Sequence, residues 1–264
     1  MLIIDCHVHV GLNWFSPVET VLTEMDMNGV QHALLIQHNG FYDHTYLFEC
    51  KKRFPGRFEV VVDVDPESPR PEAQLDEYKR MGAVGVRYRP HSRFKTKGPY
   101  DMWKRAGELG LVVSGSTPGG PENLGPDYKK ILDACPDTHV QIEHLAGLLH
   151  SKPEPPFTDF KAALDCARWP NTSIKLPGVG EILPRPTLLS SGFPFKEFPV
   201  FYEMALEAFG PQRMVWGSDY PPSGGREGYR NCLDGVRCNP VLRKDGALEW
   251  ILGKSAAKIW GFKA

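Results

Sequence analysis

Two histidines separated by one residue stand near the N-terminus, in the segment Asp5-Cys6-His7-Val8-His9. The surrounding residues are nearly all apolar, which predicts a buried strand. Strand alternation places Asp5, His7 and His9 on one face and the other two residues on the opposite face. Imidazoles at this spacing can ligate one divalent metal ion, or donate hydrogen bonds to an anionic substrate. A pair of satisfied core histidines is the alternative, and the position at a strand end argues against it.

Two more side chains suited to acid–base chemistry follow later apolar runs. His144 lies in QIEHLAGL and Asp219 in MVWGSDYP. We expect Asp219 to take a proton from an attacking water as a general base. A buried structural histidine and an aspartate that caps the next helix are the alternatives. Pro221 and Pro222, directly after Tyr220, disfavour such a cap.

Several charged or polar residues at strand ends are weaker candidates for substrate contacts. Arg87 and Arg89 end one apolar run, and we expect only one of them to face inward. An inward Arg87 would suit a substrate carboxylate, whereas a rim salt bridge is the alternative. Lys175 could bind an anion or cover the helix layer with its stem. Glu181 is a candidate substrate contact or a solvated loop residue, and His38 a substitute ligand, a substrate contact or a supporting residue.

Eight apolar runs predict buried parallel strands at residues 2–10, 32–37, 58–64, 83–88, 111–116, 138–144, 172–176 and 213–216. Helices are predicted at residues 18–28, 71–81, 102–109, 128–134, 160–168, 198–209 and 247–260. This alternation favours a single (β/α)₈ barrel, with residues 1–264 as one domain. A doubly wound open sheet is the alternative. In a barrel, the candidates at strand ends would share one cavity.

Composition excludes several classes of protein. The formal net charge of -1 argues against a nucleic-acid-binding domain. No apolar run approaches the roughly 20 residues of a membrane span, and no signal peptide is recognisable. The six cysteines are scattered without a CxxC pair, which favours free thiols in the reducing cytoplasm. The oligomeric state stays open, a homo-oligomer included.

The segments DCHVHVG, QIEHLAGL, IKLPGVGE and MVWGSDYP, in this order, resemble the amidohydrolase superfamily. Within it they resemble the "amidohydrolase 2" branch, which holds 2-pyrone-4,6-dicarboxylate and sugar lactonases and metal-dependent decarboxylases. The resemblance covers nearly the whole chain. It implies a TIM barrel in which His7, His9, His144 and Asp219 form the metal and catalytic site.

One departure from the family pattern concerns the metal. Many metal-dependent members have a histidine or a carboxylated lysine at the end of the fifth strand, where this chain reads LVVSGST. We therefore expect at most one divalent ion, zinc or manganese, held by His7, His9 and Asp219 with or without His144. A metal-free site is the other option, because lactonases of this branch include metal-independent members.

Three functions follow from these residues. The first is hydrolysis of a small carboxylated ester or lactone, with Asp219 as the base and His144 polarising the carbonyl. The second is metal-dependent, non-oxidative decarboxylation of an aromatic or dienoic acid, which the missing fifth-strand ligand disfavours. The third is an inactive barrel that binds a small molecule, which the four matched residues argue against.

Overall fold

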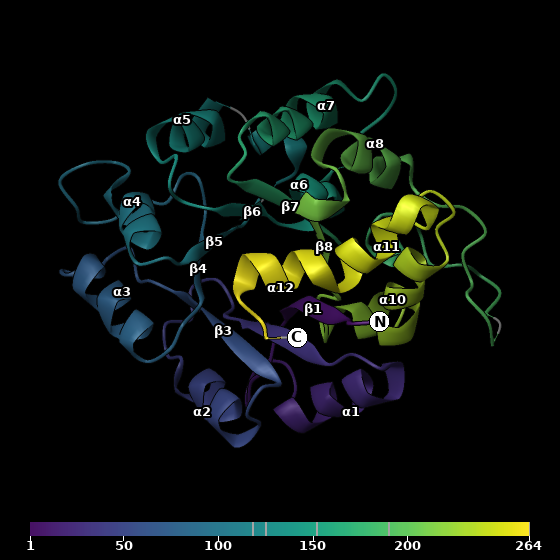
Figure 1. The fold of residues 1–264 in the computed structure, drawn as a ribbon, viewed down its shortest axis with the longest axis horizontal. Helices are drawn as coiled ribbons and strands as arrows, with labels where there is room; N and C mark the ends of the chain where they lie inside the picture. Colours follow the sequence, from purple (N-terminus) through teal and green to yellow (C-terminus); the bar gives the residue numbers. More distant parts are fainter. Residues whose placement is uncertain (118, 125, 152, 190, 264) are drawn as a thin grey trace.

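The computed structural model describes residues 1–117, 119–124, 126–151, 153–189 and 191–263. Parallel strands pair in chain order in one eight-stranded sheet, with helices around its outside (Figure 1). The strands are β1 (Ile4–Val8), β2 (His32–Ile36), β3 (Phe58–Asp63), β4 (Gly85–Tyr88), β5 (Val112–Gly115), β6 (Val140–Ile142), β7 (Thr172–Leu176) and β8 (Met214–Trp216).

The sheet closes on itself between its first and last strands. A parallel bridge joins Val8 to Tyr220. The His9 N–H donates to the Tyr220 carbonyl, and the Asp219 N–H donates to the His7 carbonyl, both over 2.9 Å. These contacts confirm the predicted barrel, and the alternative of an open sheet is wrong.

The helices fall where the hydrophobic pattern placed most of them. They are α1 (Val18–Asn28), α2 (Thr45–Arg53), α3 (Pro71–Arg80), α4 (Asp101–Glu108), α5 (Pro126–Ala134), α6 (His144–Gly147), α7 (Thr158–Leu164), α8 (Val200–Phe209), α9 (Pro222–Arg226), α10 (Tyr229–Arg237), α11 (Ala247–Glu249) and α12 (Ser255–Trp260). A π-helical turn at Trp250–Lys254 joins the last two.

The sequence did not predict α2 and α10, nor the short helices α6 and α9 of four and five residues. Helix α2 buries only Leu47 and Cys50, so its apolar stripe is too narrow to produce a clear helical period. Helix α10 contains Gly235, a poor helix former. A Cβ at this position would lie 2.7 Å from Val179 Cγ2, so the glycine permits close packing instead.

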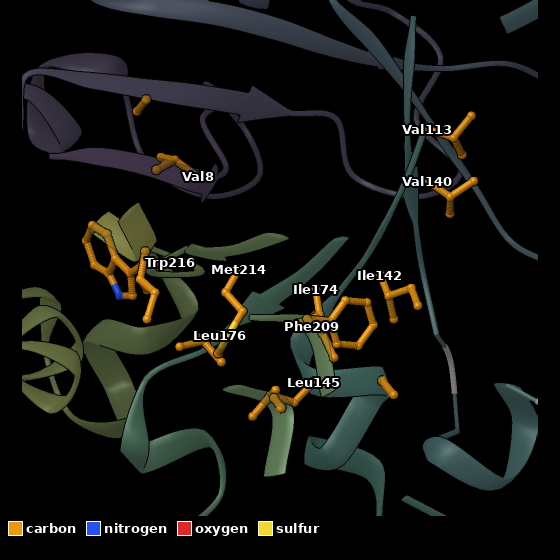
Figure 2. Packing of buried hydrophobic residues seen from close by; sticks show 14 of the residues in the cluster. Val8, Val113, Val140, Ile142, Leu145, Ile174, Leu176, Phe209, Met214 and Trp216 are labelled. Atoms are coloured by element: carbon orange, nitrogen blue, oxygen red, sulfur yellow. The ribbon is translucent and has the colours of Figure 1, made fainter. Parts of the chain in front are cut away.

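Buried apolar side chains form two clusters on the two faces of the barrel wall. The outer cluster joins strand residues such as Val8, Val113 and Trp216 to the buried sides of the helices (Figure 2). The inner cluster includes Ile4, Leu34 and Val215, and it is closed by residues of the C-terminal helix. The barrel is therefore packed on both faces, as parallel sheets require.

Strand β1 departs from simple alternation. Between Asp5 and Val8 its register against β2 shifts, because three steps on β1 match two on β2. Cys6 consequently packs with Ile4 in the inner cluster, and the Asp5 carboxylate accepts the Ser218 N–H over 2.8 Å. The expectation that Asp5 shares a face with the histidines, and that Cys6 points away, is wrong because of this bulge.

Two further expectations concern compartment and cysteines. All six cysteines carry free thiols, and five of them are buried. Within the described ranges, no helix combines the length and the apolar character that crossing a bilayer would need.

The C-terminal helix closes the base of the barrel through Trp260. This side chain is buried, and its indole N–H donates to Gln141 Oε1 over 2.8 Å. A Cβ at Gly85 would lie 2.5 Å from the Trp260 ring, so the fit is tight.

We expect Trp260→Ala to lower the free energy of unfolding by about 3–5 kcal/mol, because it opens a cavity and leaves Gln141 unpaired. Urea denaturation measures this loss. Trp14→Ala is the control, because Trp14 is 69% exposed and its removal leaves no cavity. Equal losses in both variants would contradict the role of Trp260 as a plug.

Candidate active site

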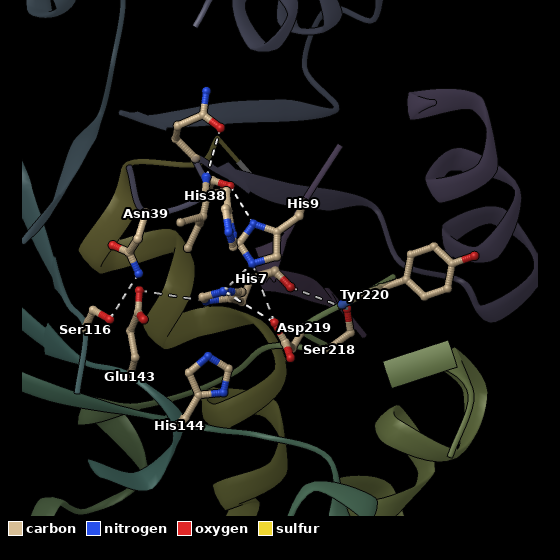
Figure 3. Close-up of polar contacts among 12 residues, drawn as sticks. His7, His9, His38, Asn39, Ser116, Glu143, His144, Ser218, Asp219 and Tyr220 are labelled. Atoms are coloured by element: carbon tan, nitrogen blue, oxygen red, sulfur yellow. Dashed lines mark hydrogen bonds and ion pairs between the residues drawn. The ribbon is translucent and has the colours of Figure 1, made fainter. Parts of the chain in front are cut away.

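The carboxyl ends of β1, β6 and β8 bring His7, His9, His144 and Asp219 together (Figure 3). The two Nε2 atoms of His7 and His9 are 3.0 Å apart. They lie 3.6 and 3.5 Å, respectively, from Asp219 Oδ1. The ring centres of His144 and His7 are 4.7 Å apart. The four residues expected to meet at one site therefore do so.

This donor set has dimensions that suit one metal ion. In a zinc tetrahedron with bonds of about 2.0–2.1 Å, neighbouring ligand atoms are roughly 3.3 Å apart. The His7, His9 and Asp219 atoms can therefore occupy three corners of one tetrahedron. His144 can offer a fourth, because its ligand atom and those of His7 and Asp219 all lie within 4.8 Å of one another. The fifth strand, β5, was expected to lack a metal ligand. Its Ser114 donates its hydroxyl to Glu143 over 2.6 Å.

The hydrogen bonds of the first two histidines run in one direction. The Ile36 carbonyl can only accept, so His9 Nδ1 donates to it over 2.7 Å and His9 Nε2 keeps its lone pair. His7 Nε2 then donates to His9, and His7 Nδ1 accepts from the Lys175 ammonium. Burial and the Lys175 charge lower the pKa of His7 well below its usual value, as this neutral form requires. A metal ion would compete with this chain, because it needs both Nε2 lone pairs.

Glu143 is the anion at the floor of the site. Arg87 donates to it through two nitrogens, Nε over 3.0 Å and Nη2 over 2.7 Å. Lys175 Nζ lies 3.9 Å away. Burial opposes ionisation of Glu143, but Arg87 and Lys175 outweigh burial and hold the pKa of Glu143 well below its usual range. Burial in turn lowers the pKa of Lys175 to about 8, against the attraction of Glu143.

The expectation that only one of the two arginines after the fourth apolar run faces inward is wrong. Both line the cavity, because residues two apart along a strand share a face and Arg89 directly follows the end of β4 at Tyr88. The Arg87 guanidinium was expected to bind a substrate carboxylate. It is bound to Glu143 instead, so it is not free for that role. Arg89 lines the same cavity, and its buried Nε has no hydrogen-bond partner among the described residues, so its guanidinium is not bound to a carboxylate in the way that of Arg87 is.

Glu181 and Arg226 connect His144 to Asp219. His144 Nδ1 lies 2.8 Å from Glu181 Oε1 and donates to it. Arg226 Nη2 lies 3.3 Å from Glu181 Oε2 and 3.0 Å from Asp219 Oδ2. Burial opposes ionisation of Asp219, but the neighbouring histidines and Arg226 hold its pKa well below the usual range. Asp219 is therefore a fixed anion with one oxygen on Arg226 and the other toward the histidines.

The backbone is strained where it presents the catalytic candidates. His144, Leu145 and Ala146 have φ values of 51°, 46° and 63°, and Asp219 has 52°. Each left-handed residue with a side chain costs about 1–2 kcal/mol. Such strain persists only where the surrounding structure enforces it, and it collects at functional sites. Gly147 completes the turn at a position where a Cβ would lie 2.4 Å from the Thr117 carbonyl oxygen.

A cavity of about 330 Å³ opens above these groups. His38 lines it, and its contact with substrate stays a prediction. Lys175 and Glu181 were expected to bind substrate, but both are buried, and their charges face His7 and His144. The wall is otherwise aromatic and polar, and includes His9, Trp14, Phe15, Asn39, Arg87, Arg89, Ser116, Thr117, Glu143, His144 and Asp219.

Three participants were missed or undervalued in the sequence. Glu143 directly follows β6 and precedes His144, and a charge at such a buried strand end was a usable signal. Arg226 lies in an irregular glycine-rich segment, where no periodicity points inward. Arg89 was named but not distinguished from Arg87.

The two arginines should respond differently to removal of charge. Arg87→Met leaves Glu143 buried without its bidentate partner, so we expect a loss of about 3–5 kcal/mol in the free energy of unfolding. Arg89→Met should change stability by no more than about 1 kcal/mol, and should weaken binding of a small dicarboxylate such as succinate. Urea denaturation and calorimetric titration measure the two effects. The reverse pattern would show that Arg87 is the free anion-binding group.

Comparison with known proteins agrees with this architecture. Two curated relatives are 4-sulfomuconolactone hydrolases. The one from Hydrogenophaga intermedia is 25% identical, over 86% of this chain and 72% of the relative. The one from Rhizobium radiobacter is 26% identical, over 93% and 81%. The zinc-bound crystal structure of an amidohydrolase from Burkholderia multivorans aligns over 100% of both chains with a TM-score of 0.77, at 17% identity. A sequence model of the amidohydrolase family (Amidohydro_2) matches residues 4–262, so the chain belongs to this family.

Proposed function

We propose that this protein is a hydrolase that opens a small carboxylated ester or lactone by attack of water. The observation that carries the proposal is the convergence of an anionic Asp219, His144 and a free Arg89 on one cavity. The two curated relatives support a lactone, because both are named as lactone hydrolases. The six free thiols support a location in the cytoplasm.

Asp219 is placed to accept the proton of the attacking water. Arg226 occupies Oδ2, so Oδ1 remains for a water beside His7 and His9. Because the pKa of Asp219 is held low, Asp219 is ionised at neutral pH but is a weak base. Transfer to such a base is efficient only if the water is itself acidified.

A divalent ion would meet that need. We propose zinc or manganese, held by His7, His9 and Asp219, with His144 able to supply a fourth ligand. Such an ion polarises a carbonyl and lowers the pKa of water bound to it.

His144 is placed to stabilise the oxyanion and to protonate the leaving alkoxide. Its Nδ1–H donates to Glu181, which orients the ring. When it does not ligate an ion, a protonated His144 would present Nε2–H to the developing oxyanion and give that proton to the leaving alkoxide. Asp219 would pass the proton of the attacking water to solvent, from which His144 would take up a new one. Arg89 holds a substrate carboxylate at the cavity wall.

Asp219→Asn tests the base. The amide keeps size and hydrogen bonding but cannot accept a proton at neutral pH, so we expect turnover to fall by about 10²- to 10⁴-fold or more. Melting temperature should change much less than turnover, because the amide oxygen of Asn can still accept the hydrogen bond of Arg226. Lactone opening is measured through the proton that it releases. Release of CO₂ would indicate decarboxylation instead. A variant with wild-type turnover would exclude Asp219 as the base.

Metal removal tests the ligand set. We expect dialysis against a chelator to abolish turnover, and one equivalent of Zn²⁺ or Mn²⁺ to restore it. His9→Ala should lower the bound metal measured by elemental analysis, whereas the control His32→Ala, which changes a histidine remote from the site, should not. Full turnover in chelated, metal-free protein would show that the hydrogen-bonded chain from Lys175 to His9 is the working state.

A further inference from the structure

A second cavity of about 610 Å³ adjoins the catalytic one. It lies between the loops that follow β1 and β2, and it shares Trp14, Phe15 and His38 with the catalytic cavity. Its remaining walls are mainly apolar and include Val10, Leu12, Phe41, Tyr46 and Leu47. The function proposed above leaves this space unused.

The loop that forms one wall is built to hold its aromatic side chains in place. The Gly11 N–H donates to the Ser16 carbonyl over 3.0 Å and closes the loop. A Cβ at Gly11 would lie 2.3 Å from the Trp14 carbonyl oxygen, so the tight turn needs glycine. Phe15 has a φ of 74° and stacks on the His9 ring with centroids 4.8 Å apart. The strained backbone at Phe15 thus places its ring against that of His9, so the apolar wall contacts a catalytic candidate.

Large apolar side chains on this wall face solvent. Leu12 is 72% exposed, Trp14 69% and Phe41 54%. Gathered around one cavity, exposed apolar groups of this size mark a surface that binds something apolar. Burying them together would remove a substantial apolar area from water.

The two cavities differ in the charges that line them, because arginines line only the catalytic one. The catalytic cavity has Arg89 with an unpartnered Nε. The lining of the second cavity includes Asp43 and Glu49 but no lysine or arginine. A carboxylate is therefore attracted to the Arg89 side and repelled from the other.

Building on the function proposed above, we propose that the substrate is an amphiphilic acid: a carboxylated lactone with an apolar alkyl or aryl substituent. The carboxylate binds at Arg89, the lactone lies over Asp219 and His144, and the substituent occupies the cavity between Trp14 and Phe41. His38, which lines both cavities, contacts the junction between them.

The binding test uses simple ligands that need no catalysis. Butanoate, hexanoate and octanoate are titrated into the protein by calorimetry. Burial of two methylenes is worth roughly a tenfold gain in affinity, so we expect about that gain at each step. The double variant Leu12→Ser/Phe41→Ser should reduce each step below threefold. The control Leu188→Ser, which changes an apolar residue that is 86% exposed and outside both cavities, should retain the steps.

The inference would be overturned if the affinity of the wild-type protein did not rise with chain length. It would also be overturned if the double variant gained as much affinity at each step as the wild-type protein. A turnover test separates it from the proposed function. Among γ-lactones with the same ring carboxylate, we expect the hexyl compound to exceed the methyl compound about tenfold or more in kcat/KM, and the double variant to abolish this preference. Absence of turnover with every lactone would overturn the proposed function, and the carboxylate series would still decide whether the second cavity binds an apolar chain.

Discussion

The structure of the site depends on one buried carboxylate, that of Glu143. A charge at the centre of a barrel is expensive to desolvate, and it is tolerated only when it is paired and hydrogen bonded. Arg87 and Ser114 supply direct hydrogen bonds, and Lys175 supplies a second positive charge. Without Glu143, two cations would face each other in the barrel interior.

A chain of polar contacts runs from the Glu143 carboxylate through Lys175 to His7 and His9. Lys175 is held near Glu143 and donates to His7, which fixes the tautomer that His7 presents to His9. Gly217 permits this arrangement, because a Cβ there would lie 2.8 Å from His7 Cβ and 2.9 Å from Lys175 Cδ. The same cation opposes a metal ion at His7, so the floor of the site sets how tightly an ion can be held.

The sequence was sufficient for the barrel and for the four central residues, and the reason is geometric. Residues at the carboxyl ends of parallel strands must meet in a closed barrel, so His7, His144 and Asp219 could be brought together without knowledge of the loops. The faces of β1 could not be predicted in full. A bulge adds one residue to a strand without altering its composition, and it moved Asp5 and Cys6 to faces opposite to those expected.

Residues that act through loops were harder to predict for a related reason. Arg226 reaches Asp219 from the end of a five-residue helix, and Arg89 enters the cavity from the loop directly after β4. Arg226 follows no period of two or of 3.6 residues, and the period of two places Arg89 on the same face as Arg87 without showing which of them is bound to a buried carboxylate. Partner and burial, which decide the role of a charge, are tertiary properties.

The barrel separates two tasks that its residues could not perform together. Groups on strands, tied to buried Glu143, are held too firmly to adapt to a substrate of different shape. The loops after β1 and β2 carry no charge of this cluster, so their side chains can vary without disturbing it. Phe15 is the exception, because its ring lies against His9. A bulky substrate group that displaces the Phe15 ring would therefore also displace the His9 ring. The shape of the substrate that the loops bind is in this way coupled to the position of the catalytic histidines.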